Sequence, residues 1–153
     1  MILAIDPGNV QSAYVLMGAD YRPVDYGKVD NAVLLGMIKP EHDVVLEMVA
    51  SYGMGVGEEV FETVFWIGRF FERAVQTCNE TPRRLYRKDV KMNLCSSNRA
   101  KDGNIIIALV DRFGERKSKK NPDGWFPPQG SGWADDVWQA YALGVTALDK
   151  VPF

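Results

Sequence analysis

Apolar residues follow two different periods along this chain, and these periods divide it into strands and helices. Short apolar runs that end at turn-forming residues are typical of strands. Strands are predicted over Met1–Asp6, Ser12–Met17, Tyr21–Val29, Asp43–Val49 and Arg83–Arg87. Segments in which apolar residues recur every three or four positions are typical of helices. Helices are predicted over Asn31–Ile38, Glu58–Cys78, Asp89–Leu94, Ala100–Phe113 and Ala134–Lys150.

The order of these elements indicates an α/β fold. The first three strands follow one another, and the short Gly18-Ala19-Asp20 connection favours an antiparallel meander. The later strands alternate with helices, which is typical of β-α units. The strand over Asp43–Val49 is apolar on both faces, as in the centre of a covered sheet, and is interrupted only by Glu47. We expect a single domain over residues 1–153, built on a mixed five-stranded sheet flanked by helices.

Two segments carry further expectations. The apolar stripe of the long helix is predicted to face the core and consists of Val60, Phe61, Val64, Phe65, Gly68, Phe71 and Val75. Residues Glu115–Gly132 combine prolines, glycines and lysines, which predicts a mobile surface loop.

Composition and charge narrow the class of protein. The chain has 153 residues, 46% of them hydrophobic, which is enough for one full core. No apolar run approaches the ~20 residues of a membrane span, and no charged segment precedes the N-terminal apolar residues, so we expect a cytoplasmic protein without a membrane partner. Cys78 and Cys95 are interpreted as thiols in a reducing compartment. The net charge of −2 does not indicate a nucleic-acid binder, although local basic clusters decide that question.

Acidic residues occupy the positions at which a metal site is expected. Asp6 and Glu47 each lie near the carboxyl end of a predicted central strand. If these strands are parallel neighbours, the two carboxylates approach each other, and a divalent cation such as Mg²⁺ would compensate their repulsion. Alternatively, Asp6 caps the Pro-Gly turn that follows it, and Glu47 pairs with an internal lysine or arginine.

The first turn of the last helix supplies a third acid, either Asp135 or Asp136. Asp136 is in line with the small apolar row of Ala140, Leu143 and Ala147, so it is predicted to point towards the sheet. Asp135 would then be a second carboxylate ligand or would interact with the ligand Asp136 from outside the metal site. Alternatively, both acids only favour the helix N-terminus electrostatically.

The motifs around these acids resemble those of a known family. Ile5-Asp6-Pro7-Gly8-Asn9, followed by Ser12-Ala13-Tyr14, resembles the opening of RuvC-type Holliday junction resolvases, whose fold is that of ribonuclease H. Leu46-Glu47 and Ala134-Asp135-Asp136 resemble the second and third acidic motifs of that family. The stretch from Pro82 through Val90-Lys91 and Arg99-Ala100-Lys101 to Ile105 resembles the segment in which a lysine faces the DNA. The small size and the glycine-rich loop after Glu47 suggest a phage-type member.

This resemblance implies a metal-dependent nuclease that cleaves branched DNA by phosphodiester hydrolysis. Asp6 would be the shared ligand of two Mg²⁺ ions, for which Mn²⁺ substitutes, and Glu47 and Asp136 would complete the coordination. Lys101 or Lys91 would balance charge near the phosphate. The family usually carries two acids about one turn apart on the last helix, whereas here Trp133 and Gln139 stand three residues before and after Asp136. The fourth acid is therefore either Asp135 or absent.

DNA binding is predicted to use two basic clusters and one loop. The first cluster consists of Arg83, Arg84, Arg87, Lys88 and Lys91, and the second of Arg112, Arg116, Lys117, Lys119 and Lys120. Tyr52 and Met54, in the loop after Glu47, would stack at the branch point. A four-way junction has two strands to cut, which favours a homodimer with two-fold symmetry, and Trp66, Phe70 and Phe71 are the predicted dimer face.

Other functions fit parts of the same pattern. A general branched-DNA nuclease or an RNA-processing nuclease would keep the fold and change the substrate. A phosphate-binding turn of the sugar-kinase type would use the same Asp-x-Gly, but such ATPases need two domains of this kind. A nucleic-acid-binding domain without catalytic activity is consistent with an absent fourth acid.

Overall fold

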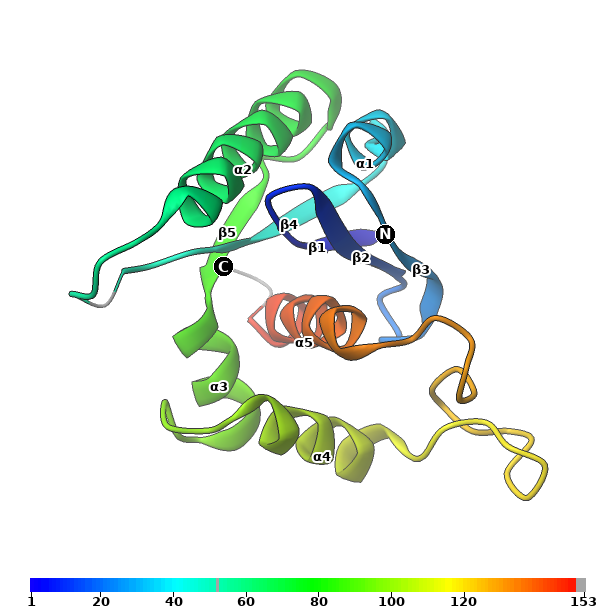
Figure 1. Cartoon of the computed structure of the whole chain (residues 1–153). Helices are drawn as coiled ribbons and strands as arrows, with labels where there is room; N and C mark the ends of the chain where they lie inside the picture. The colour runs from blue at the N-terminus through cyan, green and yellow to red at the C-terminus, as the bar shows by residue number, and fades with distance from the viewer. Residues whose placement is uncertain (52, 151–153) are drawn as a thin grey trace.

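A computed structural model describes residues 1–51 and 53–150, and its centre is a five-stranded sheet. The strands are β1 (Ile2–Asp6), β2 (Gln11–Met17), β3 (Pro23–Asp30), β4 (Asp43–Met48) and β5 (Arg83–Tyr86). Their order across the sheet is β3-β2-β1-β4-β5 (Figure 1). β1, β2 and β3 form an antiparallel meander, and β1, β4 and β5 are parallel. The predicted mixed five-stranded sheet is confirmed.

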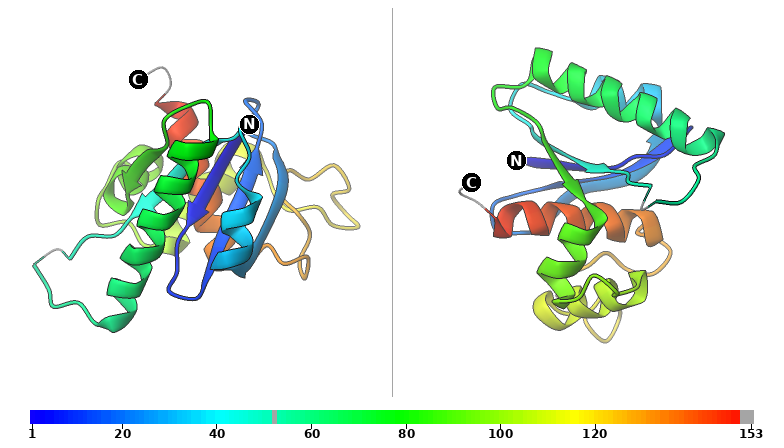
Figure 2. Two further views of the ribbon diagram at one scale, coloured as in Figure 1. Left: turned by 90° about the horizontal axis from the view of Figure 1, so that it is seen from above. Right: turned by 90° about the vertical axis from the view of Figure 1, so that its left-hand side faces the viewer.

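Helices cover both faces of this sheet. They are α1 (Asn31–Met37), α2 (Glu58–Thr77), α3 (Arg87–Cys95), α4 (Asp102–Phe113) and α5 (Asp135–Asp149). α1 and α2 lie on one face and α5 on the other, while α3 and α4 pack outside α5 (Figures 1 and 2). None of the helices within the described ranges combines the length and apolar character needed to cross a membrane. Cys78 and Cys95 are free thiols, as expected.

Alternation along the strands separates two cores. Leu3 and Ile5 pack towards α1 and α2, whereas Ile2 and Ala4 pack towards α5. α5 is buried along most of its length because the sheet covers one side and α3 and α4 cover another. Its close approach to the sheet depends on Gly144, where an added Cβ would lie 2.3 Å from the Met17 sulfur. Because α5 packs closely on the sheet, the first turn of this helix lies near the sheet surface.

The predicted inward stripe of α2 is wrong. The helix buries Thr63, Ile67, Phe70 and Ala74, whereas Phe61, Val64, Phe65 and Val75 of the predicted stripe are exposed. The helix carries apolar residues around most of its circumference, so two stripes have helical spacing and periodicity alone cannot choose between them. The predicted dimer face changes as well, because Phe70 is a core residue and Trp66 and Phe71 are partly buried.

The prediction of a surface loop over Glu115–Gly132 is wrong for its aromatic residues. Phe126 is fully buried and contacts Trp138 and Tyr141, with ring centroids 4.6 and 5.2 Å away. Trp125 stacks on Phe113 and donates a hydrogen bond from Nε1 to the Tyr141 hydroxyl. The neighbouring prolines and glycines are typical of loops, but the two aromatic side chains bury apolar area and anchor the segment. We call residues 115–132 the anchored extension (yellow to orange in Figure 1).

Candidate active site

Asp6 and Glu47 are brought together by the parallel pairing of β1 and β4. Ile5 pairs with Leu46, so the next residues along both strands, Asp6 and Glu47, come side by side. Both residues are two positions beyond core residues of the α5 side, Ala4 and Val45, and therefore point to the same face. The predicted convergence of the first two acids follows directly from this register.

The same row continues across the antiparallel half of the sheet. Asp6 pairs with Ala13 on β2, and Ala13 pairs with Lys28 on β3. Lys28 therefore projects on the face that carries the acids. Sequence reasoning missed this lysine, although the alternation of β2 and β3 would have found it once the register of the meander was known.

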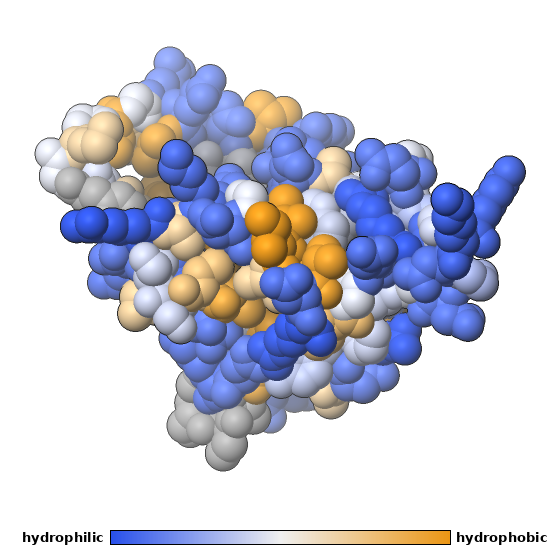
Figure 3. Space-filling view, turned by 90° about the horizontal axis from the view of Figure 1, so that it is seen from below, coloured by the Kyte–Doolittle hydropathy of each residue, from blue (hydrophilic) through white to orange (hydrophobic). Residues whose placement is uncertain are grey.

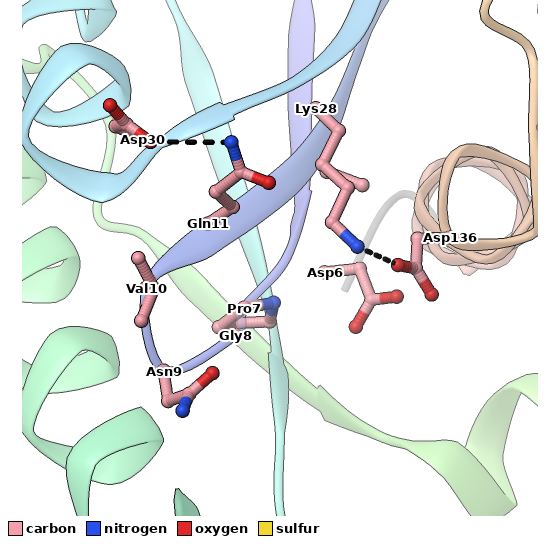
Figure 4. Close-up of a pocket in the computed structure, with 10 residues that line it drawn as sticks. Asp6, Pro7, Gly8, Asn9, Val10, Gln11, Lys28, Asp30 and Asp136 are labelled. Carbon is pink, nitrogen blue, oxygen red and sulfur yellow. Dashed lines mark hydrogen bonds and ion pairs between the residues drawn. The ribbon is translucent and has the colours of Figure 1, made fainter.

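Asp136 reaches the row from the first turn of α5. Its Oδ2 accepts a hydrogen bond from Lys28 Nζ at 2.5 Å, and its charge raises the pKa of Asp6. Asp6, Lys28 and Asp136 line one pocket together with the Pro7–Gln11 turn (Figure 4). Asp136 therefore lies near Asp6, with its side chain half-exposed, and its role as a metal ligand stays a prediction.

Burial and neighbouring charges shift the pKa values of Asp6 and Glu47, and the Asp6 carboxyl group is the most affected. Burial, followed by repulsion from Glu47, raises the pKa of Asp6 to about 9, and a hydrogen bond to Glu47 adds to the effect. Burial also raises the pKa of Glu47, while the hydrogen bond from Asp6 and the Arg87 charge lower it. Burial and mutual repulsion therefore disfavour the doubly ionised form of this pair. A divalent cation held by the two carboxylates would relieve the repulsion.

Arg87 lies against the acids, at the start of α3. Its Nη1 is 3.9 Å from Glu47 Oε1, and its Nη2 donates a hydrogen bond to Asp102. The Glu47 side chain is only 13% exposed, so this arginine limits the cost of burying the carboxylate. The ion pair that was one of two interpretations of Glu47 is present, and it coexists with the acid cluster.

Asp135 lines the pocket next to that of Asp6, and Lys28 and Asp136 belong to both pockets. Within residues 1–51 and 53–150, no group of three or more histidine, cysteine, aspartate or glutamate side chains lies in an arrangement that would hold a metal ion. The fitting donors are the paired carboxylates of Asp6 and Glu47, to which Asp136 is adjacent. Their all-oxygen chemistry suits Mg²⁺ or Mn²⁺.

The whole fold is similar to two solved structures. Thermus thermophilus RuvC superposes with a TM-score of 0.64 at 14% identity, over 96% of this chain and 93% of that chain. T. thermophilus RuvC in complex with Holliday junction substrate also gives a TM-score of 0.64, at 15% identity, over 95% and 90%. The chain has the RuvC fold. No family model and no curated protein sequence matches it.

The predicted charge-balancing lysines are placed differently. Lys101 is exposed at the start of α4, and no ion pair joins it to an acid within the described ranges. The charge of Lys91, in contrast, lowers the pKa of Glu47. Lys28, which the sequence did not suggest, contacts Asp136 directly.

The predicted DNA-binding residues do not all lie beside the acids. Arg83 has Nη2 3.9 Å from Asp43, at the start of β4, and its Nη1 donates a hydrogen bond to the Ala147 carbonyl near the end of α5. Arg84 lies over the Phe71 ring and Lys88 over the Tyr86 ring. Lys119 and Lys120 are exposed on the anchored extension. Tyr52 lies outside the described residues. The other loop residues around it, Ser51 and Gly53–Gly57, are exposed.

Proposed function

We propose that this protein is a metal-dependent endonuclease that cleaves four-way (Holliday) DNA junctions by phosphodiester hydrolysis. The observation that carries the proposal is the convergence of Asp6, Glu47 and Asp136 at one edge of a RuvC-type sheet. The similar structure solved with a Holliday junction substrate supports the substrate class. The phage-type assignment and the cytoplasmic location stay predictions.

The residues of the site divide the chemical work between them. Asp6 and Glu47 would hold Mg²⁺, or Mn²⁺ in its place, with Asp136 beside them. When bound, a divalent cation activates a water molecule and stabilises charge on the phosphate. Asp6 and Glu47 would bind the ion as carboxylates, and Arg87, 3.9 Å from Glu47, would support the charge of Glu47. Lys91 and Lys101 remain candidates for balancing charge on the substrate. Lys91 is favoured, because its charge lowers the pKa of Glu47.

Three adjoining pockets support a proposed binding path for one DNA strand. The pocket of Asp6 shares Lys28 and Asp136 with the pocket at the start of α5, and that pocket shares Arg116 with a third. The third pocket is also lined by Lys117. Because phosphates are bound mainly by lysine and arginine, a strand leaving the acids would follow this path to the anchored extension.

Lys119 and Lys120 would contact the DNA backbone further along the anchored extension. Arg84, Lys88 and Lys91 would contact another arm, and Arg87 would serve both the acids and the adjoining phosphate. Arg83, whose contacts are with Asp43 and the Ala147 carbonyl, stays a predicted DNA contact. Tyr52, next to the exposed residues of the loop after β4, stays the predicted stacking residue at the branch point.

A homodimer would place two such sites on one junction. The exposed apolar residues of α2, Phe61, Val64 and Phe65, are the proposed contact between copies, because an uncovered apolar helix face of this kind marks an interaction site. Phe65→Glu should convert the dimer to a monomer in light scattering. Ile107→Glu is the control, because Ile107 is an exposed apolar residue of α4 rather than α2. Figure 3 shows that apolar side chains also gather on the face seen from below. A wild-type monomer would refute this assembly.

Cleavage of a synthetic four-way junction with mapped cut sites tests the function. Wild type with Mg²⁺ should make symmetric nicks, and Asp6→Asn should bind the junction but cut at least ~100-fold more slowly, in line with loss of a metal ligand. Asp111→Asn, on the exposed side of α4, is the matched control and should cut normally. Equal cutting of flaps or RNA hybrids would select a general nuclease, and binding without cutting by wild type would select a non-catalytic domain.

A further inference from the structure

A lysine, Lys28, lines the acidic site and contacts one of its acids. Three acids, Asp6, Glu47 and Asp136, meet at the sheet edge, with Arg87 at the Glu47 end and Lys28 at the Asp136 end. Figure 4 shows the Lys28 ammonium extended towards Asp136, close to Asp6. Lys28 is thus the cationic side chain of the Asp136 half of the site.

Sheet register fixes this position of Lys28. Neighbouring strands are about 4.8 Å apart, so Lys28 and Asp6, on either side of Ala13, have backbones roughly 10 Å apart. Ala13 is buried and lines the same pocket as Asp6, Lys28 and Asp136. The Lys28 side chain reaches Asp136 in that pocket.

No further carboxylate stands one turn from Asp136 on α5, because the residues three before and three after it are Trp133 and Gln139, both buried. Asp135 lines the adjoining pocket, which Lys28 and Asp136 also line, and is not among the residues that line the pocket of Asp6. Asp6 and Glu47 therefore form one carboxylate pair, whereas Asp136 is already paired with an ammonium group at 2.5 Å.

We propose that Lys28 is a resident cation that takes the place of the second metal ion. On this assignment, which rests on the proposed nuclease function, one divalent ion binds at Asp6 and Glu47, and the Lys28 ammonium neutralises Asp136 and donates hydrogen bonds to the phosphate. An ammonium group is a compact charge with three donors, suited to a non-bridging phosphate oxygen. Fixed positive charge at the transferring phosphoryl group stabilises the charge that develops there.

Counting bound metal ions tests this assignment without any substrate. Mn²⁺ titration of the full chain, by calorimetry and by paramagnetic resonance of free Mn²⁺, should give one ion for wild type. Lys28→Met frees Asp136 and should bind a second ion or bind Mn²⁺ at least ~10-fold more tightly. Lys28→Arg keeps the charge and should behave as wild type. Lys39→Met, in the exposed α1–β4 connection, is the control, and a cooperative thermal transition at a melting temperature close to that of wild type shows that each variant is folded.

The possible outcomes separate this inference from the function it rests on. Two ions in wild type, or Mn²⁺ binding in Lys28→Met that is unchanged or weaker, would overturn the role of Lys28. Junction cutting provides the second measurement, in which Lys28→Met should be slower by about 10²-fold and Lys28→Arg by less than about 10-fold. A wild type that binds one ion and cuts no branched DNA would refute the nuclease function, while the ion count would still decide which group neutralises Asp136.

Discussion

The Asp6 carboxyl group makes the stability of this protein depend on pH in a way that needs no DNA to detect. Burial and the adjacent acids raise its pKa from 3.8 to about 9. A carboxyl whose pKa is raised by folding stabilises the native state fully below the unfolded-state pKa, and this contribution is lost as the pH rises towards the folded-state pKa. The metal-free protein should therefore lose stability between about pH 4 and pH 9.

The size of the effect follows from the difference between the two pKa values. At ~1.36 kcal/mol per pKa unit, the native state is penalised by up to about 6 kcal/mol at pH 8, where the unfolded chain has lost the proton. Solvent reaches the pocket and the Asp6 and Glu47 carboxyl groups titrate as a coupled pair, so we expect about 2–5 kcal/mol. Asp6→Asn removes the titration and keeps the side-chain shape. This variant should melt roughly 5–15 °C above wild type at pH 8 and close to it at about pH 4.

Thermal denaturation followed by circular dichroism measures this difference. In EDTA, the wild-type melting temperature should fall more steeply with pH than that of Asp6→Asn. Mn²⁺ at pH 8 should raise the melting temperature of wild type but not that of Asp6→Asn, because a ligand that binds only the native state stabilises it. Asp111→Asn should follow wild type throughout. Parallel pH profiles for wild type and Asp6→Asn would refute the electrostatic reasoning.

Further predictions concern the anchored extension. Phe126→Ala should destabilise the protein by about 3–5 kcal/mol in urea denaturation, and a loss below 1 kcal/mol would show that Phe126 does not anchor the segment. Gly124→Ala places a Cβ 2.4 Å from the Lys117 backbone nitrogen and should cost about 1–3 kcal/mol, whereas Gly103→Ala, with nothing within 4 Å, should cost nothing. Replacing Lys119 and Lys120 with glutamine should reduce the slope of log K against log salt for junction binding by about 1–2, and an unchanged slope would remove them from the DNA contact.

The sheet and the acids were accessible from the sequence because each depends on local signals. The strand that ends at Asp6 and the one that carries Glu47 are apolar runs with a single acid near the carboxyl end, and parallel pairing aligns these ends. Helical phase indicated that Asp136 lies on the side of α5 that packs on the sheet, and Asp136 lines the pocket of Asp6. The choice of Asp136 over Asp135 as a metal ligand stays a prediction.

Other features depend on contacts that no local pattern encodes. α2 has two apolar stripes, and only the position of the sheet decides that Ile67 and Phe70 are inside. Phe126 lies among loop-forming residues, and its burial is decided by the space beside Trp138 and Tyr141. The position of Lys28 beside Asp136 depends on the register of three strands. No motif around Lys28 in the sequence could therefore have predicted it.

The register of the sheet also decides whether a folded molecule has a working site at all. Successive side chains of a strand point to opposite faces, so a slip of one residue between β1 and β4 would turn Glu47 towards α2 while leaving most backbone hydrogen bonds possible. Such a molecule would retain its helices and much of its compactness, yet its carboxylates would be on opposite sides of the sheet. Far-ultraviolet spectra alone would therefore be a poor test of sample quality for this protein, and metal affinity a sensitive one.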